Sequence, residues 1–162
     1  MKLKEITWDN FWDVVNLKPA KSQSKFLPAN SIFMAQAYVN LKMHYRDICF
    51  SIYHNSDLIG FTKIVFVEKN EPTFNFSEDT YYIDALMIDE KHQGKGFGKL
   101  SLSEILSWIH AKPWGLVHSI KSSCYDENAA MVGLFQKFNF TKTNDFVRGR
   151  NALRIYTMER DL

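Results

Sequence analysis

Strand-like and helix-like spacings of apolar residues alternate along the first part of the chain. Residues 2–7 alternate between apolar and polar side chains, which predicts a short strand. Residues 9–17 then follow a helical spacing that a proline ends. A second helical pattern continues to residue 41 and begins at Asn30 or Ser31, either of which can cap a helix. The pattern therefore predicts one strand followed by two helices.

The middle of the chain is dominated by strand patterns. Residues 47–54 and 58–67 are rich in β-branched and aromatic side chains and flank the turn cluster Asn55-Ser56-Asp57, so they predict a hairpin. Residues 68–80 are acidic and polar around a proline, which is typical of a loop. Residues 81–89 form a mostly apolar run, as expected of a strand that is covered on both faces.

A glycine-rich segment then leads into the last part of the pattern. The apolar positions at 102, 105, 106 and 109 form one stripe of an amphipathic helix. Residues 116–125 predict a strand, residues 126–138 a helix, and residues 140–146 and 152–158 two closing strands around a turn at 148–151. The expected order is β-α-α-β-β-β-α-β-α-β-β, which is that of a mixed α/β domain.

Composition and cysteine content narrow the class of protein. With 162 residues, of which 46% are hydrophobic and 23% charged, we expect a single domain over residues 1–162. Cys49 and Cys124 are too few for a disulfide framework, so a reducing cytoplasm is the expected location. We expect no secretory signal at the N-terminus, and no membrane span, because no run approaches the roughly 18 apolar residues that a span needs.

The balance of charged residues indicates what class of partner the protein binds. Twenty Lys and Arg against eighteen Asp and Glu give a net charge of +2, which is far from the basic footprint of a nucleic-acid-binding domain. We therefore expect a small-molecule partner, with no nucleic acid and no membrane. The five histidines have no ligand-like spacing with one another or with the cysteines, so no metal site is expected.

One segment carries a specific chemical signal: Gln93-Gly94-Lys95-Gly96-Phe97-Gly98-Lys99, between the apolar strand and the helix. Glycines allow close approach to the backbone, and the first-turn amides of a helix suit a phosphate. The spacing is not that of a Walker loop, because three residues separate Gly94 from Gly98 and Leu100 follows Lys99. It also lacks the third glycine of a dinucleotide fingerprint. A connecting turn without a ligand is the alternative.

The spacing Gln-x-x-Gly-x-Gly at Gln93, Gly96 and Gly98 resembles the pyrophosphate-binding motif of the GNAT family of N-acetyltransferases. Residues 125–140 resemble the later helix of that family, and residues 82–96 look most like the bacterial spermine/spermidine acetyltransferases. The resemblance implies a GNAT fold, with a central, mixed, mostly antiparallel sheet flanked by helices. It also implies direct acetyl transfer from acetyl-CoA to a primary amine of a small molecule, without a covalent enzyme intermediate. A homodimer is left open.

The same resemblance assigns cofactor-binding residues. It implies that the pyrophosphate is held by Gln93, Gly94, Lys95, Gly96, Phe97, Gly98 and Lys99. It places the strand segment Leu86, Met87 and Ile88 beside the pantetheine and the thioester, with the backbone of Leu86 and Ile88 in an oxyanion-type role. Asn128 is expected to touch the pantetheine arm. An ordinary helix N-cap is the alternative for Asn128, and the two roles are compatible.

Two positions depart from the family pattern. Phe135 stands where many members carry a Tyr that protonates the departing CoA thiolate, and Phe has no proton to give. Tyr125 or solvent is the candidate substitute, with simple packing as the alternative role of Tyr125. An acetyl-CoA-binding module with little or no turnover is therefore a rival to the enzyme. Asn139 replaces a glycine, but Asn tolerates a positive φ, so we expect the turn to persist.

The acceptor amine must be neutral to attack, so a group is needed to take its proton. Asp84 is the candidate base or amine anchor, because strand alternation puts it on the face shared with Tyr82, Leu86 and Ile88. A strand-end carboxylate that is hydrogen-bonded to a neighbour is the alternative.

Acidic residues are concentrated near this candidate base. Five of the eighteen acids fall within seventeen residues: Glu68, Glu71, Glu78, Asp79 and Asp84. Such a patch favours a polyamine and would repel the carboxylate of an amino acid. A solvated acidic loop is the alternative reading of the patch. A protein N-terminus or another amine, such as an aminoglycoside, is the alternative acceptor.

Overall fold

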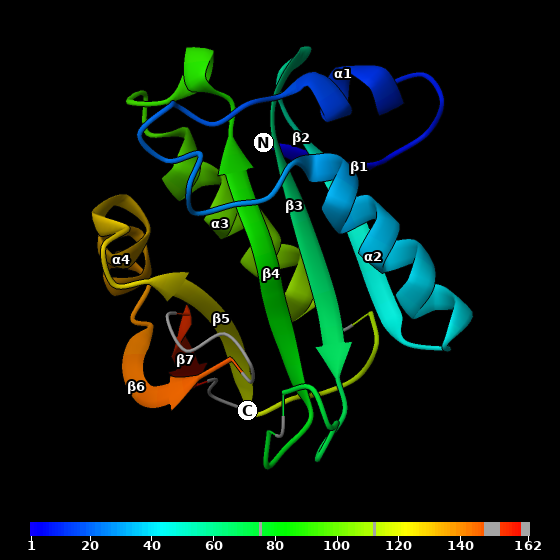
Figure 1. Cartoon of the computed structure of the whole chain (residues 1–162), viewed down its shortest axis with the longest axis vertical. Helices are drawn as coiled ribbons and strands as arrows, with labels where there is room; N and C mark the ends of the chain where they lie inside the picture. The colour runs from blue at the N-terminus through cyan, green and yellow to red at the C-terminus, as the bar shows by residue number, and fades with distance from the viewer. Residues whose placement is uncertain (75, 112, 148–152, 160–162) are drawn as a thin grey trace.

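The structure, a computed structural model, describes residues 1–74, 76–111, 113–147 and 153–159 (Figure 1). Its elements are β1 (Lys2–Glu5), α1 (Phe11–Asn16), α2 (Asn30–Lys42), β2 (Arg46–His54), β3 (Asp57–Val67), β4 (Thr80–Ile88), a 3-10 turn (Glu90–His92), α3 (Phe97–His110), β5 (Ser119–Tyr125), α4 (Ala129–Lys137), β6 (Thr141–Phe146) and β7 (Leu153–Glu159). The order of helices and strands is the one that the hydrophobic pattern predicts. The turn expected at 148–151 lies outside the described residues.

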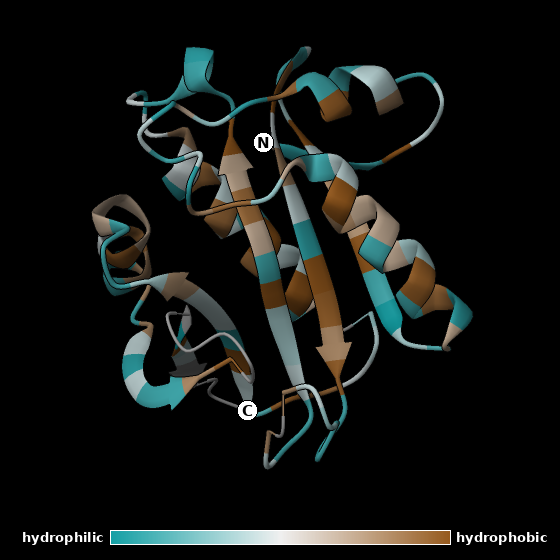
Figure 2. Ribbon diagram, in the orientation of Figure 1, coloured by the Kyte–Doolittle hydropathy of each residue, from teal (hydrophilic) through white to brown (hydrophobic). Residues whose placement is uncertain are grey.

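The strands form one sheet in the order β1-β2-β3-β4-β5-β7-β6, of which only β4 and β5 are parallel neighbours among the described residues. The other neighbouring pairs are antiparallel. The predicted mixed, mostly antiparallel sheet is therefore confirmed. Its central strands β3 and β4 are largely apolar, whereas β6 at the edge is hydrophilic (Figure 2).

Helices cover both faces of this sheet. The apolar stripe of α3 packs on one face with α4, and buries strand residues such as Ile64 and Ile83. The helices α1 and α2 pack on the other face through Val14 and Phe33, which contact Phe61 of β3. This two-sided burial explains why β3 and β4 read as nearly continuous apolar runs rather than as alternating ones.

The strands β4 and β5 pair over only part of their length. Their ladder runs from Thr80 and Ser119 to Ile83 and Ser122, after which β4 continues to Ile88 without a β5 partner. Figure 1 shows the two strands diverging beyond this point. Backbone groups that lose a ladder partner need another one, so this divergence is where the fold can accept a ligand.

A β-bulge lies in β4 at the start of the divergence. Lys63 of β3 pairs with Ala85, but the next residue, Ile64, pairs with Ile83, so Asp84 is the extra residue between two pairs. A bulge of this kind re-aims side chains and bends its strand.

The bulge changes which face each residue of β4 occupies. Ile83 and Leu86 pack on the α3 side, whereas Ala85 and Met87 pack on the side of α1 and α2. Asp84 contacts Lys63 on the α2 side. The expectation that Asp84 shares a face with Leu86 and Ile88 is therefore wrong, because strict alternation does not continue across an extra residue.

Two local expectations about turns have different outcomes. Asn139 takes a φ of 59°, which confirms that Asn carries this turn in the usual place of glycine. The cap expected at Asn30 or Ser31 is wrong: Ala29 is the N-cap of α2, without a side-chain cap bond. Asn30 is buried instead and donates from Nδ2 to the carbonyl of Val14 at 2.9 Å. A contact with α1 outweighs the local capping preference here.

Candidate active site

Two cavities meet where β4 and β5 diverge. We name the first, of about 780 Å³, the β4–β5 cavity, and the second, of about 440 Å³, the loop cavity. The β4–β5 cavity is lined by residues that include Lys63, Tyr82, Asp84 and Tyr125, and the loop cavity by the segment around residues 93–99. The residues that line both are Phe26, Leu27, Leu86, Asn128 and Met131. A molecule that spans both cavities therefore passes Leu86 and Asn128.

Two glycines of the loop cavity hold backbone conformations that other residues adopt rarely. Gly94 has a φ of 75°, and Gly96, the N-cap of α3, has a φ of 81°. A Cβ built on Gly96 would have no atom within 4 Å, so the space above it is open. The first bonds of α3 run from Lys99 and Leu100 to the Gly96 carbonyl, which leaves the preceding amides without intrahelical acceptors. These amides and the positive end of the helix dipole suit an anion.

The polar side chains of the loop have different roles. Gln93 donates from Nε2 to the Ile88 carbonyl at 2.8 Å and to Gln23 Oε1 at 3.1 Å, so its side chain ties the loop to the end of β4. Lys99 lines the loop cavity. Lys95 instead donates to the carbonyl of Lys91 at 2.8 Å and is not part of the cavity wall. Of the two lysines, only Lys99 is placed to meet a ligand there.

Asn128 is both a cap and a wall residue. Its side-chain oxygen accepts a hydrogen bond from the Met131 amide at 3.2 Å, which makes it the N-cap of α4. It also lines both cavities. The two expected roles are compatible in this geometry.

Beyond Ile83, the backbone of β4 has no partner in β5 at the junction of the cavities. The Ala85 carbonyl accepts from Thr62 Oγ1 at 2.7 Å, and the Asp89 amide donates to the Ile59 carbonyl at 2.9 Å, so both face β3. Backbone groups of successive strand residues point to opposite sides. The amide and carbonyl of Leu86 therefore face the side from which β5 has diverged, where they can bind an extended ligand.

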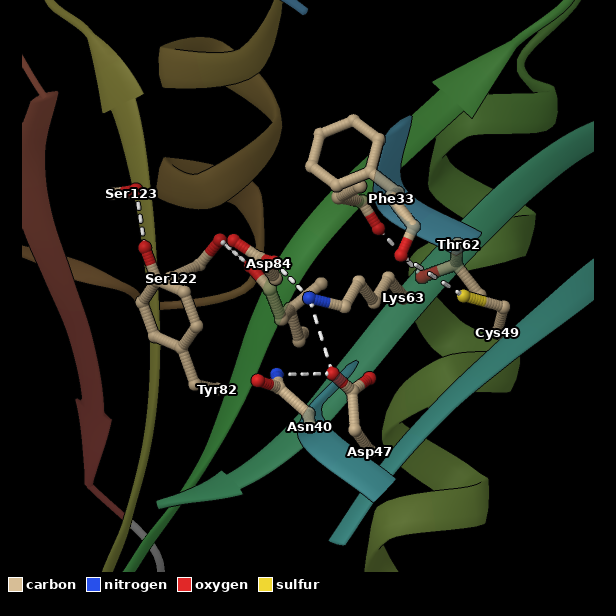
Figure 3. A network of polar contacts seen from close by, with 12 residues as sticks. Phe33, Asn40, Asp47, Cys49, Thr62, Lys63, Tyr82, Asp84, Ser122 and Ser123 are labelled. Atoms are coloured by element: carbon tan, nitrogen blue, oxygen red, sulfur yellow. Dashed lines mark hydrogen bonds and ion pairs between the residues drawn. The ribbon is translucent and has the colours of Figure 1, made fainter. Parts of the chain in front are cut away.

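Asp84 belongs to a buried network of charges on the floor of the β4–β5 cavity (Figure 3). Lys63 Nζ lies 2.7 Å from Asp84 Oδ2 and 3.2 Å from Asp47 Oδ2, and Asn40 Nδ2 donates to the same Asp47 oxygen at 2.6 Å. The side chains of Lys63, Asp47 and Asp84 are 3%, 0% and 20% exposed. Asp84 is thus the carboxylate of the network that reaches the cavity.

Burial and pairing compete in setting the pKa values of this network. Burial by itself would lower the pKa of Lys63, but the carboxylates of Asp84 and Asp47 outweigh it and raise that pKa. Burial raises the pKa of Asp47, against the opposing effects of Lys63 and Asn40. Lys63 is therefore a charged ammonium at neutral pH, and is not itself a nucleophile.

The acidic segment divides into two groups. Asp84 and Glu71 line the β4–β5 cavity, and Oε2 of Glu71 also accepts hydrogen bonds from the amides of Thr73 and Phe74 at 2.8 and 3.0 Å. Glu78 instead accepts from Ser119 Oγ at 2.6 Å, and Asp79 accepts from the Lys69 amide at 2.8 Å. The structure thus brings part of the predicted patch to the cavity, where aromatic rings form much of the wall: Phe26, Phe33, Tyr45, Phe66, Phe74, Tyr82 and Tyr125.

Tyr125 and Phe135 lie in different surroundings. Tyr125 lines the β4–β5 cavity and packs against Phe26, with ring centroids 5.7 Å apart. Phe135 is fully buried in the core against Phe140 and is not part of the wall of either cavity. The sequence resemblance places Phe135 beside the CoA thiolate, but the Phe135 side chain lines neither cavity.

Sequence reasoning missed Lys63 and Asp47. The available signal was that Lys63 is the only charged residue between Leu58 and Val67, in an otherwise largely apolar strand. A charge in a strand that is buried on both faces needs a partner of opposite charge. The partner could not be named, because Asp47 and Asp84 lie on two other strands.

The described ranges contain neither a candidate metal site nor a candidate membrane-spanning helix. Within the described ranges, no group of three His, Cys, Asp or Glu side chains is arranged to hold a metal ion. No helix in those ranges has both the length and the apolar character needed to cross a membrane.

Comparisons of the sequence with known proteins identify a family and relatives of this chain. The sequence model of the acetyltransferase (GNAT) family matches residues 15–140. The spermine/spermidine N(1)-acetyltransferase of Bacillus subtilis (strain 168) is 26% identical over 141 residues, which cover 86% of this chain and 87% of the relative.

Solved structures share the fold at lower identity. The aminoglycoside acetyltransferase AAC(6')-Ib in complex with coenzyme A superposes with a TM-score of 0.77 at 13% identity, covering 98% of this chain and 94% of the other. The spermidine N-acetyltransferase of Vibrio cholerae in complex with CoA and spermine has a TM-score of 0.67 at 15% identity, with the same coverages of 98% and 94%. Because the family match extends over most of its length, the chain belongs to the acetyltransferase (GNAT) family.

Proposed function

We propose that this protein transfers an acetyl group from acetyl-CoA, bound in the loop cavity, to a primary amine in the β4–β5 cavity, with a polyamine as the favoured acceptor. The observation that carries the proposal is that the two cavities share the wall formed by Leu86 and Asn128. A thioester at this junction would face the cofactor loop on one side and the acceptor on the other.

On the cofactor side, the segment Gln93 to Lys99 would hold the pyrophosphate through its free amides and the Lys99 ammonium. Gln93 would act by fixing the loop rather than by touching the phosphate, since its amide already bonds Ile88 and Gln23. Asn128 and the backbone of Leu86 would meet the pantetheine arm. The open space above Gly96 supports this fit, because a Cβ there would enter it.

On the acceptor side, the amine nitrogen attacks the thioester carbonyl carbon, a C–N bond forms, the C–S bond breaks and CoA leaves as a thiolate. The Leu86 amide is the donor that would stabilise the oxyanion. Asp84 would anchor the amine and take its proton, directly or through water. Tyr125 or water would return a proton to the thiolate.

Three features favour a polyamine. Asp84 and Glu71 supply two carboxylates to the cavity wall, and the aromatic rings around them can contact cationic or methylene groups. The Bacillus relative is named a spermine/spermidine acetyltransferase. The alternative acceptors are a protein N-terminus or another amine. The aminoglycoside acetyltransferase among the structural neighbours is a reason to test an aminoglycoside as well.

The test is a turnover assay with acetyl-CoA and a panel of spermidine, spermine, an aminoglycoside, an amino acid and a peptide with a free N-terminus. We expect the highest kcat/KM with a polyamine. Turnover confined to the peptide or the aminoglycoside would mean that this compound, and not a polyamine, represents the acceptor class. Binding of acetyl-CoA without turnover of any amine would instead indicate a CoA-binding module.

A pair of variants tests the role of Asp84. Asp84→Asn should lower kcat/KM for the amine by about 10² to 10⁴, the range for loss of a general base, and leave acetyl-CoA binding unchanged. Asp79→Asn is the matched control, because it removes the same charge from a residue that bonds the Lys69 amide away from the cavity wall. Equal activity of both variants would make Asp84 a structural carboxylate.

A further inference from the structure

We infer that Lys63 and Asp47 are positioning residues for the acceptor: the buried ammonium of Lys63, held by Asp47, orients the Asp84 carboxylate toward a cationic amine in the β4–β5 cavity. This inference rests on the proposed function and deepens it. It assigns the substrate class of the cavity to a cation and names two residues, outside the family motif, that enforce it.

The geometry of the network supports this role. The Lys63 ammonium contacts Oδ2 of Asp84, so that Oδ1 can accept a hydrogen bond from another donor. Asp84 is the most exposed of the three charged side chains, whereas Asp47 is fully buried behind Lys63. Asn40 of α2 fixes Asp47 through a 2.6 Å hydrogen bond. The network therefore has one open end, and that end faces the acceptor.

The charges of the network do not balance. Asp47 of β2 and Asp84 of β4 supply two carboxylates, formally two negative charges, against the single ammonium of Lys63. The nearby Cys49 thiol of β2 stays neutral because burial raises its pKa to about 12. Asn40, the contact from α2, is uncharged. The cluster is thus left with one net negative charge, which an acceptor ammonium would neutralise.

Stability alone does not account for this arrangement. A buried ion pair seldom stabilises a fold more than apolar residues of the same size would. In addition, Oδ1 of Asp47 is buried without a hydrogen-bond partner among the described residues, which is a cost to the folded state. Without Lys63, moreover, the carboxylates of Asp47 and Asp84 would repel each other, and the pair would retain a proton. Lys63 prevents this.

The experiment compares Lys63→Met, Asp47→Asn and the double variant with the wild type, using spermidine and acetyl-CoA. We expect Lys63→Met to raise the KM for spermidine about tenfold or more, as for loss of a charge-assisted contact. The KM for acetyl-CoA and its thermal shift should stay at the wild-type values. The acidic limb of the kcat/KM profile should move to higher pH, because the unpaired carboxylates share a proton.

The double variant separates positioning from simple packing. Removing the Asp47 charge together with Lys63 leaves Asp84 as a single carboxylate, so the acidic limb should return toward the wild-type pH. A purely structural role would not give this recovery. If Lys63→Met does not fold, Asp47→Asn alone should still change the pH profile of kcat/KM, because it removes the second carboxylate from the network.

The outcomes distinguish this inference from the function on which it rests. Absence of turnover in the wild type, with every amine of the panel, would overturn both. Wild-type turnover of spermidine combined with unchanged KM and unchanged pH profiles in all three variants would overturn only the roles of Lys63 and Asp47. A rise in the KM for acetyl-CoA equal to that for spermidine would also overturn them, because it would indicate general distortion of the site.

Discussion

The rings of Phe135 and Tyr156 lie 5.1 Å apart, centroid to centroid, in the core between α4 and β7. The Tyr156 hydroxyl lies 3.5 Å from Asp126 Oδ1. Burial, with Cys124 and Asp126 adding to it, raises the pKa of Tyr156 to about 12, so this phenol keeps its proton at neutral pH. Phe135, which the sequence resemblance places where the family usually has a Tyr, thus faces the core beside a buried phenol.

This packing limits what a restored hydroxyl can do. Phe135→Tyr should raise kcat at most about tenfold, or about 1.4 kcal/mol, because Phe135 is not part of either cavity wall. The variant should also unfold at a lower temperature, since overpacking a full core costs about 1–3 kcal/mol. Steady-state rates and thermal melting of the two proteins check both statements.

One pair of results would contradict this expectation for Phe135. A wild-type protein that binds acetyl-CoA but acetylates no amine, together with an active Phe135→Tyr variant, would show that the missing hydroxyl limits the reaction. Tyr125→Phe is the companion variant, because Tyr125 does line the β4–β5 cavity. It should lower kcat if Tyr125 protonates the thiolate.

Acetyl-CoA should stabilise the fold through the glycine-rich loop. A ligand that binds only the native state at a hundredfold excess over its Kd adds about 2.7 kcal/mol, which thermal melting detects. Gly96→Val should abolish this shift, because its side chain would enter the open space above the loop. Gly115→Val is the matched control: Gly115 also has a positive φ and free space around it, but lines neither cavity.

Both glycine variants should lose stability from backbone strain, roughly 1–2 kcal/mol for a residue forced into the left-handed region. Only Gly96→Val should lose the response to ligand. A Gly96→Val protein that shifts as the wild type does would place the cofactor elsewhere, and an unresponsive wild type would contradict the proposed acetyl-CoA site itself.

The two lysines of the loop should differ in their effect on CoA affinity. Lys99→Ala should weaken CoA binding about tenfold, as expected for one lost contact with a charged group. Lys95→Ala should leave the affinity nearly unchanged, because the Lys95 side chain bonds the Lys91 carbonyl instead of lining the cavity. Calorimetric titration with CoA measures both, and the opposite ranking would contradict the placement of the loop.

Alkaline pH should destabilise the protein. Burial raises the pKa of Cys49 to about 12 and that of Cys124 to about 11, from the ordinary thiol pKa of 9.0. Above the ordinary thiol pKa, the cysteines of the unfolded chain lose protons that the native state retains. The free energy of unfolding therefore falls as pH rises, by at most about 1.4 kcal/mol per pH unit for each cysteine. Lys63 acts in the same direction, since its raised pKa gives stability that is lost at still higher pH.

Melting temperatures measured at increasing pH test this expectation. The midpoint should fall once the pH exceeds the ordinary thiol pKa of 9.0. Cys49→Ala and Cys124→Ala should each make the fall shallower, because each removes one of the groups responsible. A wild-type midpoint that does not depend on pH in this range would contradict the burial of both thiols.

The sequence by itself determined the order of the elements and the position of the glycine-rich loop. Both depend on local physics: the spacing of apolar residues defines strands and helices within one segment, and the loop from Gln93 to Lys99 carries glycines at three alternate positions between a strand and a helix. The cap of α4 at Asn128 and the positive φ of Asn139 are equally local. Such features need no partner from another part of the chain.

Only the tertiary structure decided how the β4–β5 cavity is built. The bulge at Asp84 arises from pairing between β3 and β4, and it moves Asp84 from the face that alternation predicts. Lys63 finds its two partners on strands β2 and β4, and Phe135 turns toward Tyr156 of β7. These contacts join residues that are distant in sequence, and their energies depend on burial and neighbouring charge. Both quantities exist only once the sheet has formed.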